Sequence, residues 1–231
     1  MSGPVLVTGG AGYVGAEVAT ALLEAGREVR VLDSLLHGQQ PIADMLEQKG
    51  ARVSIGDIRD ADLRRELLNG AEAVVHLAAI VGDPACARDP ELAQDTNVEA
   101  TRGLVADANA AGVKHLIFAS TCSNYGRMAD PEVPVDEEAQ LAPVSLYAEQ
   151  KVEIEKMLLS NGSGTTVPTC LRFATVYGAA PRMRFDLTVN EFTRELWADR
   201  ELEIFGELFW RPYVHAADAG RAIRIVLEAP R

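Results

Sequence analysis

The stretch LVTGGAGYVG, residues 6–15, places three glycines at three-residue intervals directly after the apolar run VLV. The apolar run predicts a buried strand, and the residues from Gly12 onward predict a helix. The glycines keep side chains away from the backbone N–H groups at the start of that helix. A strand, a glycine turn and a helix bind an anion well, because the N–H groups and the positive end of the helix face it. The segment therefore predicts a phosphate-binding loop.

The first 120 residues alternate short apolar runs with amphipathic stretches of helical period. Continuous hydrophobicity in AVVHLAA (73–79) and HLIFAS (115–120) indicates strands that are buried on both faces. Repeated strand–helix units with short connections predict an α/β fold with a doubly wound parallel (Rossmann) sheet. We expect strands at Pro4–Thr8, Glu28–Leu32, Arg52–Ile55, Ala73–Leu77 and His115–Ala119, and helices over 13–25, 61–68 and 90–111.

The pattern loosens after about residue 172. We expect residues 1–172 to form a nucleotide-binding domain and residues 173–231 to form a small, partial or abbreviated C-terminal substrate lobe. The predicted pieces of that lobe are a loop at 175–185, a helix at 186–199, a short strand LEIF at 202–205 and a helix from about residue 218. The polar, proline-containing segment 126–143 predicts a surface loop, and a lid is one interpretation of it.

Composition excludes several classes of protein. The chain has 231 residues, with 22 basic and 34 acidic side chains, a net charge of −12. This balance disfavours nucleic acid as a partner, because nucleic-acid binding needs a basic face. No apolar run reaches membrane-spanning length, and the chain opens on a strand rather than a signal peptide, so we expect no membrane partner and a cytoplasmic location. The three cysteines have no metal-like spacing, so we expect reduced, buried thiols and no metal site.

A second strand ends in Asp33, 18 residues past Gly15. A carboxylate at that place can accept hydrogen bonds from both ribose hydroxyls of an adenine nucleotide. It would repel a 2′-phosphate, which favours NAD over NADP. Asp57, in IGDIRD after the third strand, is a candidate for the adenine amino group, and an ordinary aspartate following a strand is the competing interpretation.

The pair Tyr147 and Lys151 in LYAEQK stands four residues apart on a predicted helix, so both side chains share a face. A free tyrosine has a pKa near 10 and is a poor base at neutral pH. We expect the lysine ammonium, together with a positive nicotinamide ring, to stabilise the phenolate and lower that pKa. Segment FASTCSNYG (118–126) follows the fifth strand, at the edge where parallel sheets bind ligands, so a hydroxyl there can hold a substrate oxygen.

Taken together, these motifs resemble the extended short-chain dehydrogenase/reductase family, in particular its NAD-dependent nucleotide-sugar epimerase/dehydratase branch. TGGAGYVG (8–15) resembles the TGxxGxxG loop of that family, and HLAA (76–79) resembles its fourth-strand motif. TNVEAT (96–101), LRFATVYG (171–178), DLTVNEFT (186–193) and RPYVHAAD (211–218) match further family motifs in the right order. The resemblance covers nearly the whole chain.

The resemblance implies roles for individual residues. Thr121, Tyr147 and Lys151 fall on catalytic positions, with Ser120 one place before the catalytic hydroxyl. The implied NAD-binding residues are Gly9, Gly12, Tyr13, Val14, Gly15, Asp33, Asp57, Ile58, Leu77, Ala78, Ala79, Asn97, Ser120, Tyr147 and Lys151. The implied substrate-binding residues are Thr121, Tyr147, Thr175, Asn190 and Arg211, with Arg182 or Arg184 as possible helpers. The two histidines His76 and His215 are expected to be structural.

Three departures narrow the expected reaction. Cys122 and Ser123 stand where the branch that dehydrates dTDP-glucose has an Asp-Glu pair, which argues against 4,6-dehydration by that route. Thr175 and Val81 stand where UDP-galactose 4-epimerases have asparagine and lysine, which argues against a strict galactose epimerase. Relatives usually continue beyond the last predicted helix, so this chain is expected to be either a fragment or a form with a shortened lobe.

The resemblance implies oxidation of a nucleoside-diphosphate sugar, at C4, by tightly bound NAD. The transient keto sugar is then reduced on its other face, loses water or epimerises at a neighbouring carbon. A reductase or dehydrogenase for a free carbonyl or alcohol substrate is the main alternative, and a non-catalytic dinucleotide sensor is a second one. A homodimer is expected, because relatives pack two helices of each subunit into a four-helix bundle.

Overall fold

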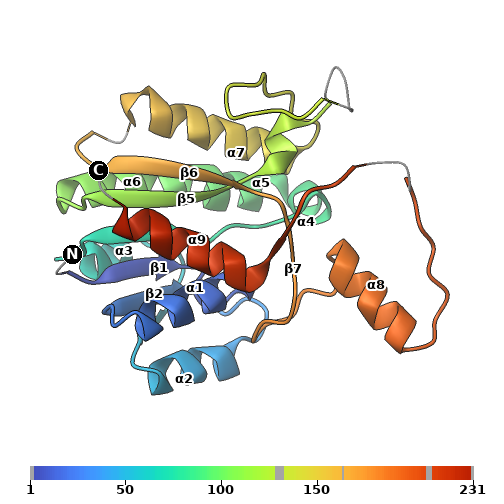
Figure 1. Cartoon of the computed structure of the whole chain (residues 1–231). Coiled ribbons are helices and arrows are strands. Elements are labelled where there is room, and N and C mark those ends of the chain that lie inside the picture. The colour runs from blue at the N-terminus through green and yellow to red at the C-terminus, as the bar shows by residue number, and fades with distance from the viewer. Residues whose placement is uncertain (1–2, 128–132, 163, 207–209, 230–231) are drawn as a thin grey trace.

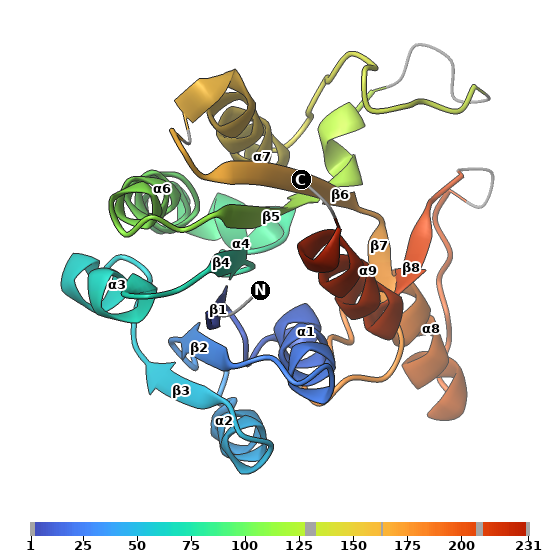
Figure 2. The same cartoon turned by 60° about the vertical axis from the view of Figure 1, so that its left-hand side comes forward.

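The computed structural model describes residues 3–127, 133–162, 164–206 and 210–229. Within these residues, six parallel strands form the main sheet (Figure 1), in the order β3-β2-β1-β4-β5-β6 (Figure 2). The strands are β1 (Val5–Thr8), β2 (Val29–Asp33), β3 (Arg52–Ile55), β4 (Ala73–His76), β5 (His115–Thr121) and β6 (Val167–Phe173). The strand order reverses between β1 and β4, which creates the crevice where open parallel sheets bind ligands.

Helices cover both faces of this sheet. Figure 2 shows α3, α6 and α7 on one face and α1, α2 and α9 on the other. The helices are α1 (Tyr13–Glu24), α2 (Gln40–Gln48), α3 (Ala61–Leu68), α4 (Asp83–Arg88), α5 (Pro90–Ala93), α6 (Ala100–Ala110), α7 (Leu146–Met157), α8 (Thr188–Trp197) and α9 (Ala216–Glu228). A π-helix (η1, Gln94–Glu99), a 3₁₀ turn (η2, Cys122–Tyr125) and a second π-helix (η3, Leu158–Gly162) complete the regular structure. The predicted α/β doubly wound architecture is confirmed.

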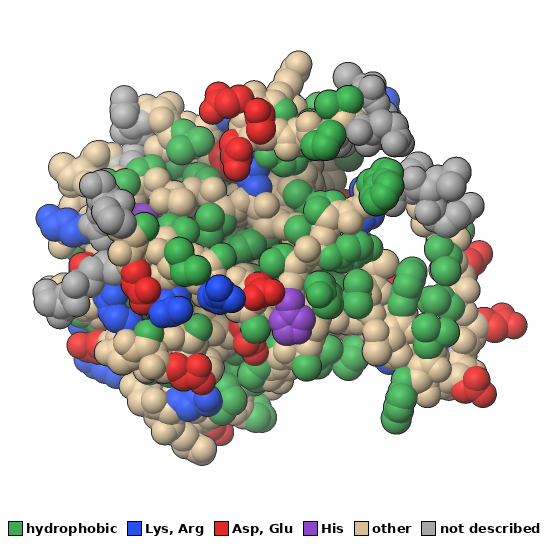
Figure 3. All heavy atoms as spheres, in the orientation of Figure 1, with side chains coloured by type: hydrophobic (Ala, Val, Ile, Leu, Met, Phe, Trp, Pro, Cys, Tyr) green, Lys and Arg blue, Asp and Glu red, His purple; other side chains and the backbone are tan. Residues whose placement is uncertain are grey.

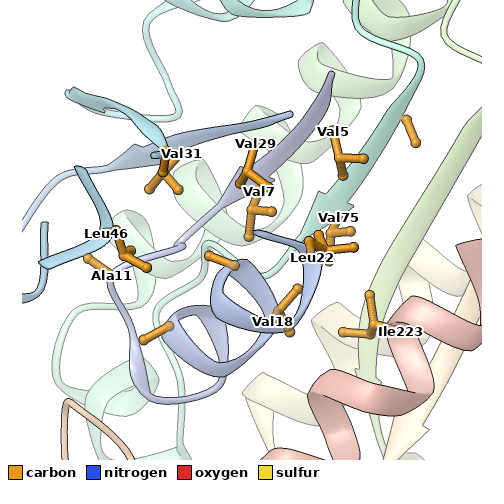
Figure 4. Packing of buried hydrophobic residues seen from close by; sticks show 14 of the residues in the cluster. Val5, Val7, Ala11, Val18, Leu22, Val29, Val31, Leu46, Val75 and Ile223 are labelled. Atoms are coloured by element: carbon orange, nitrogen blue, oxygen red, sulfur yellow. The ribbon is translucent and has the colours of Figure 1, made fainter. Parts of the chain in front are cut away.

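The first core layer lies between the sheet and helices α1, α2 and α9 (Figure 4). Its strand residues, Val7 and Val75 among them, are fully buried, as expected for strands covered on both faces. Leu22 of α1 and Ile223 of α9 reach the same cluster, and each such side chain contributes about 1.5–3 kcal/mol on burial. A Cβ on Gly220 would lie 3.2 Å from the backbone of Glu17, so α9 and α1 approach closely at this point.

The strands follow the sequence-based predictions except at four places. Residues 175–177, predicted as part of a loop, and residues 213–215, for which no strand was predicted, form short strands outside the main sheet. All five predicted strands are present, within about two residues at each end. The sheet has a sixth strand, β6, which the sequence did not reveal because its side chains are mostly half-buried and it contains Pro168. The predicted strand at 202–205 is wrong, since these residues form no regular structure and Ile204 and Phe205 are exposed.

The predicted long helix over 90–111 is divided into three parts. Helix α5 is a single turn, η1 follows with π-helical hydrogen bonding, and α6 completes the segment. Helices α2 and α4 were not predicted; α4 spans only six residues.

The C-terminal part of the chain surrounds one end of the sheet. Strands β7 (Thr175–Tyr177) and β8 (Tyr213–His215) form a parallel pair next to α8, whereas α9 returns to the main sheet. Hydrophobic side chains gather over α8 and the segment that follows it (Figure 3), including the exposed Trp197, Phe205 and Trp210. The division at residues 172 and 173 remains a prediction.

Part of the predicted lid segment, residues 128–132, lies outside the described residues. The flanks of the segment are anchored: the N–H of Ala142 donates to the carbonyl of Asn124 and the N–H of Arg127 donates to the carbonyl of Ala142, each at 3.2 Å. Within the described part of the chain, no helix is long and apolar enough to cross a bilayer.

Candidate active site

The glycine loop joins β1 to α1 with very little free space. Gly9 has a φ of +69°, and a Cβ there would lie 2.8 Å from the backbone nitrogen of Ala78. A Cβ on Gly15 would lie 2.0 Å from the carbonyl oxygen of Gly9, so no other residue fits. Gly12 caps α1 with extended backbone and no side chain. The first N–H groups of α1 have no partners within the helix, which suits them to an anion.

Asp33 fixes this loop against the end of β2. Its Oδ2 accepts from the N–H of Ala11 and its Oδ1 accepts from the N–H of Leu35, both at 2.9 Å. The residue is 7% exposed and lies in the wall of the cavity described below. Each carboxylate oxygen can accept two hydrogen bonds and here accepts one, so Asp33 can still accept a hydrogen bond from a ligand hydroxyl.

A cavity of about 480 Å³ runs along the carboxyl ends of the strands. Fourteen of the fifteen residues expected to contact NAD lie in its wall, Asn97 being the exception, and so do Thr121 and Thr175. Residues that the sequence did not single out also line it, notably His37, Thr96 and Phe173. Asp57 is in the wall too, but Arg59 grips its carboxylate at 2.6–3.1 Å and holds the pKa of Asp57 below its usual range.

Helix α7 brings Tyr147 and Lys151 to this cavity. The hydroxyl of Ser145 accepts from the N–H of Ala148 at 3.3 Å and caps the helix, so Tyr147 is in its first turn and Lys151 is one turn later. The Nζ of Lys151 donates to the carbonyl of Ala119 at 2.7 Å and lies 5.7 Å from the centre of the Tyr147 ring. The two residues therefore share a helix face and a cavity, as their spacing predicts.

The electrostatics of this pair differ from the expectation. Burial raises the pKa of Tyr147, and the positive charge that most opposes the rise is Arg184. The expected lowering of the Tyr147 pKa by Lys151 is therefore wrong for the protein without a ligand. Burial lowers the pKa of Lys151 itself to about 8. Desolvation is the largest cause of both pKa shifts, because α7 packs against β5.

Thr121 is the last residue of β5, with 9% of its surface exposed. Its Oγ1 accepts from the N–H of Ser123 at 3.1 Å and starts the η2 turn, so the hydroxyl is held in place at the cavity wall. The hydroxyl of the neighbouring Ser120 accepts from Nδ2 of Asn124 at 3.0 Å. Cys122 also lines the cavity.

Comparison with known proteins decides the family. The sequence profile of the NAD dependent epimerase/dehydratase family matches residues 5–231. The chain belongs to this family. UDP-glucose 4-epimerase of Streptomyces lividans is 40% identical over 162 residues, which are 68% of this chain and 47% of that protein. UDP-glucose 4-epimerase of Lactobacillus helveticus is 34% identical over 179 residues, 76% of this chain and 52% of that protein. The matched region thus spans about half the length of these curated relatives.

Solved structures agree over almost the whole chain. UDP-glucuronic acid 4-epimerase from Bacillus cereus, in complex with UDP-glucuronic acid and NAD, is 26% identical with a TM-score of 0.88, covering 99% of this chain and 74% of that one. UDP-glucose 4-epimerase of Thermus thermophilus, in complex with NAD, is 28% identical with a TM-score of 0.84, covering 99% and 75%. An NAD-dependent NDP-hexosamine 5,6-dehydratase involved in tunicamycin biosynthesis is 27% identical with a TM-score of 0.84, covering 99% and 73%.

Three residues that the family resemblance assigned to ligands lie outside the cavity wall. Asn97 is buried behind it: its Oδ1 accepts from the N–H of Ile80 at 2.8 Å, and its Nδ2 donates to the carbonyl of Ile80 and to Gln150 at 3.0 and 2.9 Å. Both donors of Asn97 are thus used inside the protein, and its assignment to NAD remains a prediction. Asn97 fixes the segment after β4, which does line the cavity.

Asn190 is likewise buried and engaged within the protein. Its Oδ1 accepts from the N–H of Gly178 at 3.0 Å, and its Nδ2 donates to Tyr13 Oη at 3.0 Å and to the carbonyl of Arg184 at 2.9 Å. Both N–H groups of Asn190 are used inside the protein in this structure, and its donation to substrate remains a prediction. Arg211 is exposed and outside the wall, close enough to Cys122 to act on its thiol, and its role toward substrate remains a prediction.

His76 and His215, expected from the sequence to be structural, both make hydrogen bonds within the protein. His76 is held between the hydroxyls of Thr8 and Thr101 at 2.7 and 2.8 Å, and burial lowers its pKa to about 3. His215 caps α9 by accepting from the N–H of Ala217 at 3.2 Å. The three cysteines are free, but only Cys86 is fully buried. Among the described residues, no group of histidine, cysteine or acidic side chains could hold a metal ion.

Proposed function

We propose that the chain binds NAD and epimerises a nucleoside-diphosphate sugar, most simply a UDP-sugar, by oxidation and reduction at C4. One observation carries the proposal: Thr121, Tyr147 and Lys151 lie in the wall of the cavity that also contains the glycine loop. The matched relatives are UDP-glucose 4-epimerases, which favours this reaction over reduction of a free carbonyl substrate.

The cavity suits a dinucleotide. Its glycine loop has no room for a side chain at Gly15, so the backbone stays open to a diphosphate. Asp33 supplies a carboxylate at the ribose position, supporting NAD over NADP. When bound, NAD would supply a hydride acceptor and donor for the sugar carbon and a positive ring that favours the Tyr147 phenolate.

Tyr147 is the proposed acid–base group. Its phenolate takes the proton from the C4 hydroxyl in the oxidation, and the phenol so formed gives the proton back in the reduction. Lys151 holds its own ammonium against the carbonyl of Ala119, a position from which it supports the phenolate as that charge forms. Thr121, fixed by its bond to Ser123, holds the same sugar oxygen. Rotation of the keto sugar between the two steps inverts C4.

The residues after Thr121 support epimerisation. Removal of water from a neighbouring carbon needs an additional acid and base, and Cys122 and Ser123 occupy the cavity wall at the places where an Asp-Glu pair would stand. Burial raises the pKa of the Cys122 thiol, which makes it a poor base near neutral pH. After the same first step, dehydration of the keto sugar is therefore less favoured than epimerisation.

Assembly and location extend the proposal. A homodimer formed through α6 and α7 is our expectation, and light scattering at micromolar concentration would test it. The cytoplasm remains the predicted location.

Arg211 is the proposed cation for the substrate diphosphate, and Arg211→Ala is expected to raise the KM for the nucleotide sugar while NAD content stays constant.

The decisive experiment has two steps. Denaturing the purified protein should release NAD, measured by chromatography. The folded protein should then convert one member of a panel of UDP-, GDP-, CDP- and dTDP-sugars, with the product identified by NMR and no net consumption of NAD. Stoichiometric oxidation of NADH with a free carbonyl compound, and no conversion of any nucleotide sugar, would replace the proposal with a reductase.

A further inference from the structure

A side chain of the phosphate-binding loop reaches the C-terminal part of the chain. Tyr13 is the first residue of α1, directly after Gly12. Its hydroxyl donates to the carbonyl of Gly178 at 2.6 Å, across 165 residues of sequence. It also accepts from Nδ2 of Asn190, across 177 residues, at 3.0 Å. Both side chains are buried, at 4% and 5% exposure.

Asn190 completes a network of hydrogen bonds with Tyr13, Gly178 and Arg184. Through its two donors and one acceptor it joins Tyr13, the N–H of Gly178 and the carbonyl of Arg184. We call these four residues the clasp. Gly178 itself cannot shift easily, because it has a φ of +107° and a Cβ there would lie 2.2 Å from the ring of His215.

The clasp holds the segment 178–187, which carries two arginines into the cavity wall. The guanidinium of Arg184 is fixed by Asp186 at 2.5 and 3.1 Å, and its charge acts on Tyr147 and on Tyr13. Arg182 has no carboxylate within ion-pair distance among the described residues. The charge of Arg182 acts on His37, at the end of the cavity that holds Asp33.

This arrangement matters because the whole chain is acidic. At a net charge of −12, an anionic substrate is repelled at long range, and local cations must compensate. Of the cationic side chains in the wall, Lys151 donates to Ala119 and Arg59 is paired with Asp57. The two arginines of segment 178–187 therefore supply cationic charge whose place depends on the clasp.

We propose that Tyr13 and Asn190 are positioning residues: through the clasp, the loop that binds the cofactor phosphates sets the place of Arg184, which lines the same cavity as Tyr147, and hence the affinity for the nucleotide sugar. The effect on substrate rests on the proposed function, whereas the link between the two loops does not. The clasp also explains why Asn190 is buried and shared with Tyr13 rather than open to the cavity.

The link is tested by hydrogen–deuterium exchange on the NAD-loaded protein, comparing the parent with Tyr13→Phe. This change removes the hydroxyl and keeps the ring. Amides of segment 178–187 should exchange about tenfold faster or more, while those of α1 stay at the parent rate. Tyr177→Phe is the matched control, since Tyr177 adjoins Gly178 and has ring contacts but no hydrogen bond through its hydroxyl among the described residues. Equal exchange in Tyr13→Phe and the parent would overturn the clasp.

The effect on substrate is tested by steady-state kinetics of the same variants. Loss of the hydroxyl leaves buried polar groups unpaired, so KM for the nucleotide sugar should rise about 5- to 100-fold. The value of kcat should fall far less, and NAD content should match that of the parent. A purely structural role would instead lower NAD content and melting temperature together. Asn190→Leu should give the same KM, and the double variant should be no worse than either single one; additive effects would refute the coupling. If the parent converts no nucleotide sugar, the proposed function fails, and the exchange result still decides the clasp.

Discussion

Replacing Arg172 with methionine should leave a carboxylate buried without its partner. The side chain of Glu155 is 2% exposed, and that of Arg172 is 16% exposed. The Nε of Arg172 lies 3.1 Å from both oxygens of Glu155, and its Nη2 lies 2.8 Å from one of them. Breaking such a buried pair costs about 3–5 kcal/mol of the free energy of unfolding. That is a large share of the roughly 5–15 kcal/mol that stabilises a domain.

The same pair also orders the turn after the catalytic strand. Oε1 of Glu155 accepts from Nδ2 of Asn124 at 2.9 Å, and Nη1 of Arg172 donates to the hydroxyl of Tyr125 at 3.1 Å. Both partners belong to the η2 turn, which begins immediately after Thr121. We therefore expect Arg172→Met to lower turnover as well as stability, because the Thr121 hydroxyl loses its support.

Arg102→Met is the matched control. Arg102 pairs with Glu153 at 2.5 Å, but the two side chains are 43% and 44% exposed. An exposed pair contributes only about 0–1 kcal/mol. Because Arg102 and Glu153 lie on α6 and α7, both variants are compared at a concentration where light scattering gives the mass of a monomer. The two variants lose the same charge, so any difference between them then reports burial.

Urea unfolding followed by circular dichroism measures the effect. With a slope of about 2–3 kcal/mol per molar urea, Arg172→Met should lower the midpoint by roughly 1–2 M and Arg102→Met by less than about 0.5 M. Adding Glu155→Leu to Arg172→Met should restore much of the loss, since the unpaired charge is then removed. If the two single variants unfold at the same midpoint, the burial of the Arg172 pair is not what stabilises this edge of the sheet.

Three further outcomes follow from the site. Tyr147→Phe should keep NAD and lower turnover by about 10²- to 10⁴-fold, and near-normal turnover would remove Tyr147 from acid–base catalysis. Asp33→Ser should lower the affinity for NAD about 10- to 150-fold in a binding titration and reduce the preference of the protein for NAD over NADP. A parent protein that binds NADP better than NAD would contradict the assignment of Asp33 to the ribose. For His76, the folded pKa of about 3 lies below the unfolded value of about 6.5, so the unfolded state binds the proton first as pH falls. Stability should therefore drop below pH 6.5, by roughly 2 kcal/mol at pH 5, and His76→Gln should flatten that dependence in urea titrations.

The sequence predicted those parts of the fold that rest on local patterns. Buried strands and the glycine loop have periodicity or steric demands that are visible in a few residues, and the structure has them where expected. Strand β6 escaped because Val167 is exposed and its remaining residues are half-buried, so hydrophobicity alone does not mark it. The prediction of a strand at 202–205 failed for the opposite reason, since Ile204 and Phe205 are apolar yet exposed and the segment forms no strand.

In the candidate site, too, only the side chains that a local sequence pattern marks could be predicted. Tyr147 and Lys151 could be predicted because they stand four residues apart on one helix, and Thr121 because it matches the catalytic hydroxyl position of the family motif. The contacts of Asn97 and Asn190 could not, because their partners Ile80, Gln150 and Tyr13 come from distant parts of the sequence. The raised pKa of Tyr147 was missed for a related reason: burial is a property of the folded chain, whereas charge can be counted from the sequence.

The packing of α9 on α1 has a consequence for how the chain folds during translation. The apolar face of α1 is complete once Glu24 has been synthesised, yet Ile223 and Leu227, which help to cover it, come about 200 residues later. During translation, the apolar face of α1 therefore lacks its α9 cover while β2, β1 and β4 pair beside it. A ribosome-stalled chain ending before Ala216 should therefore bind a hydrophobic chaperone or dye at α1, and release it once α9 has emerged.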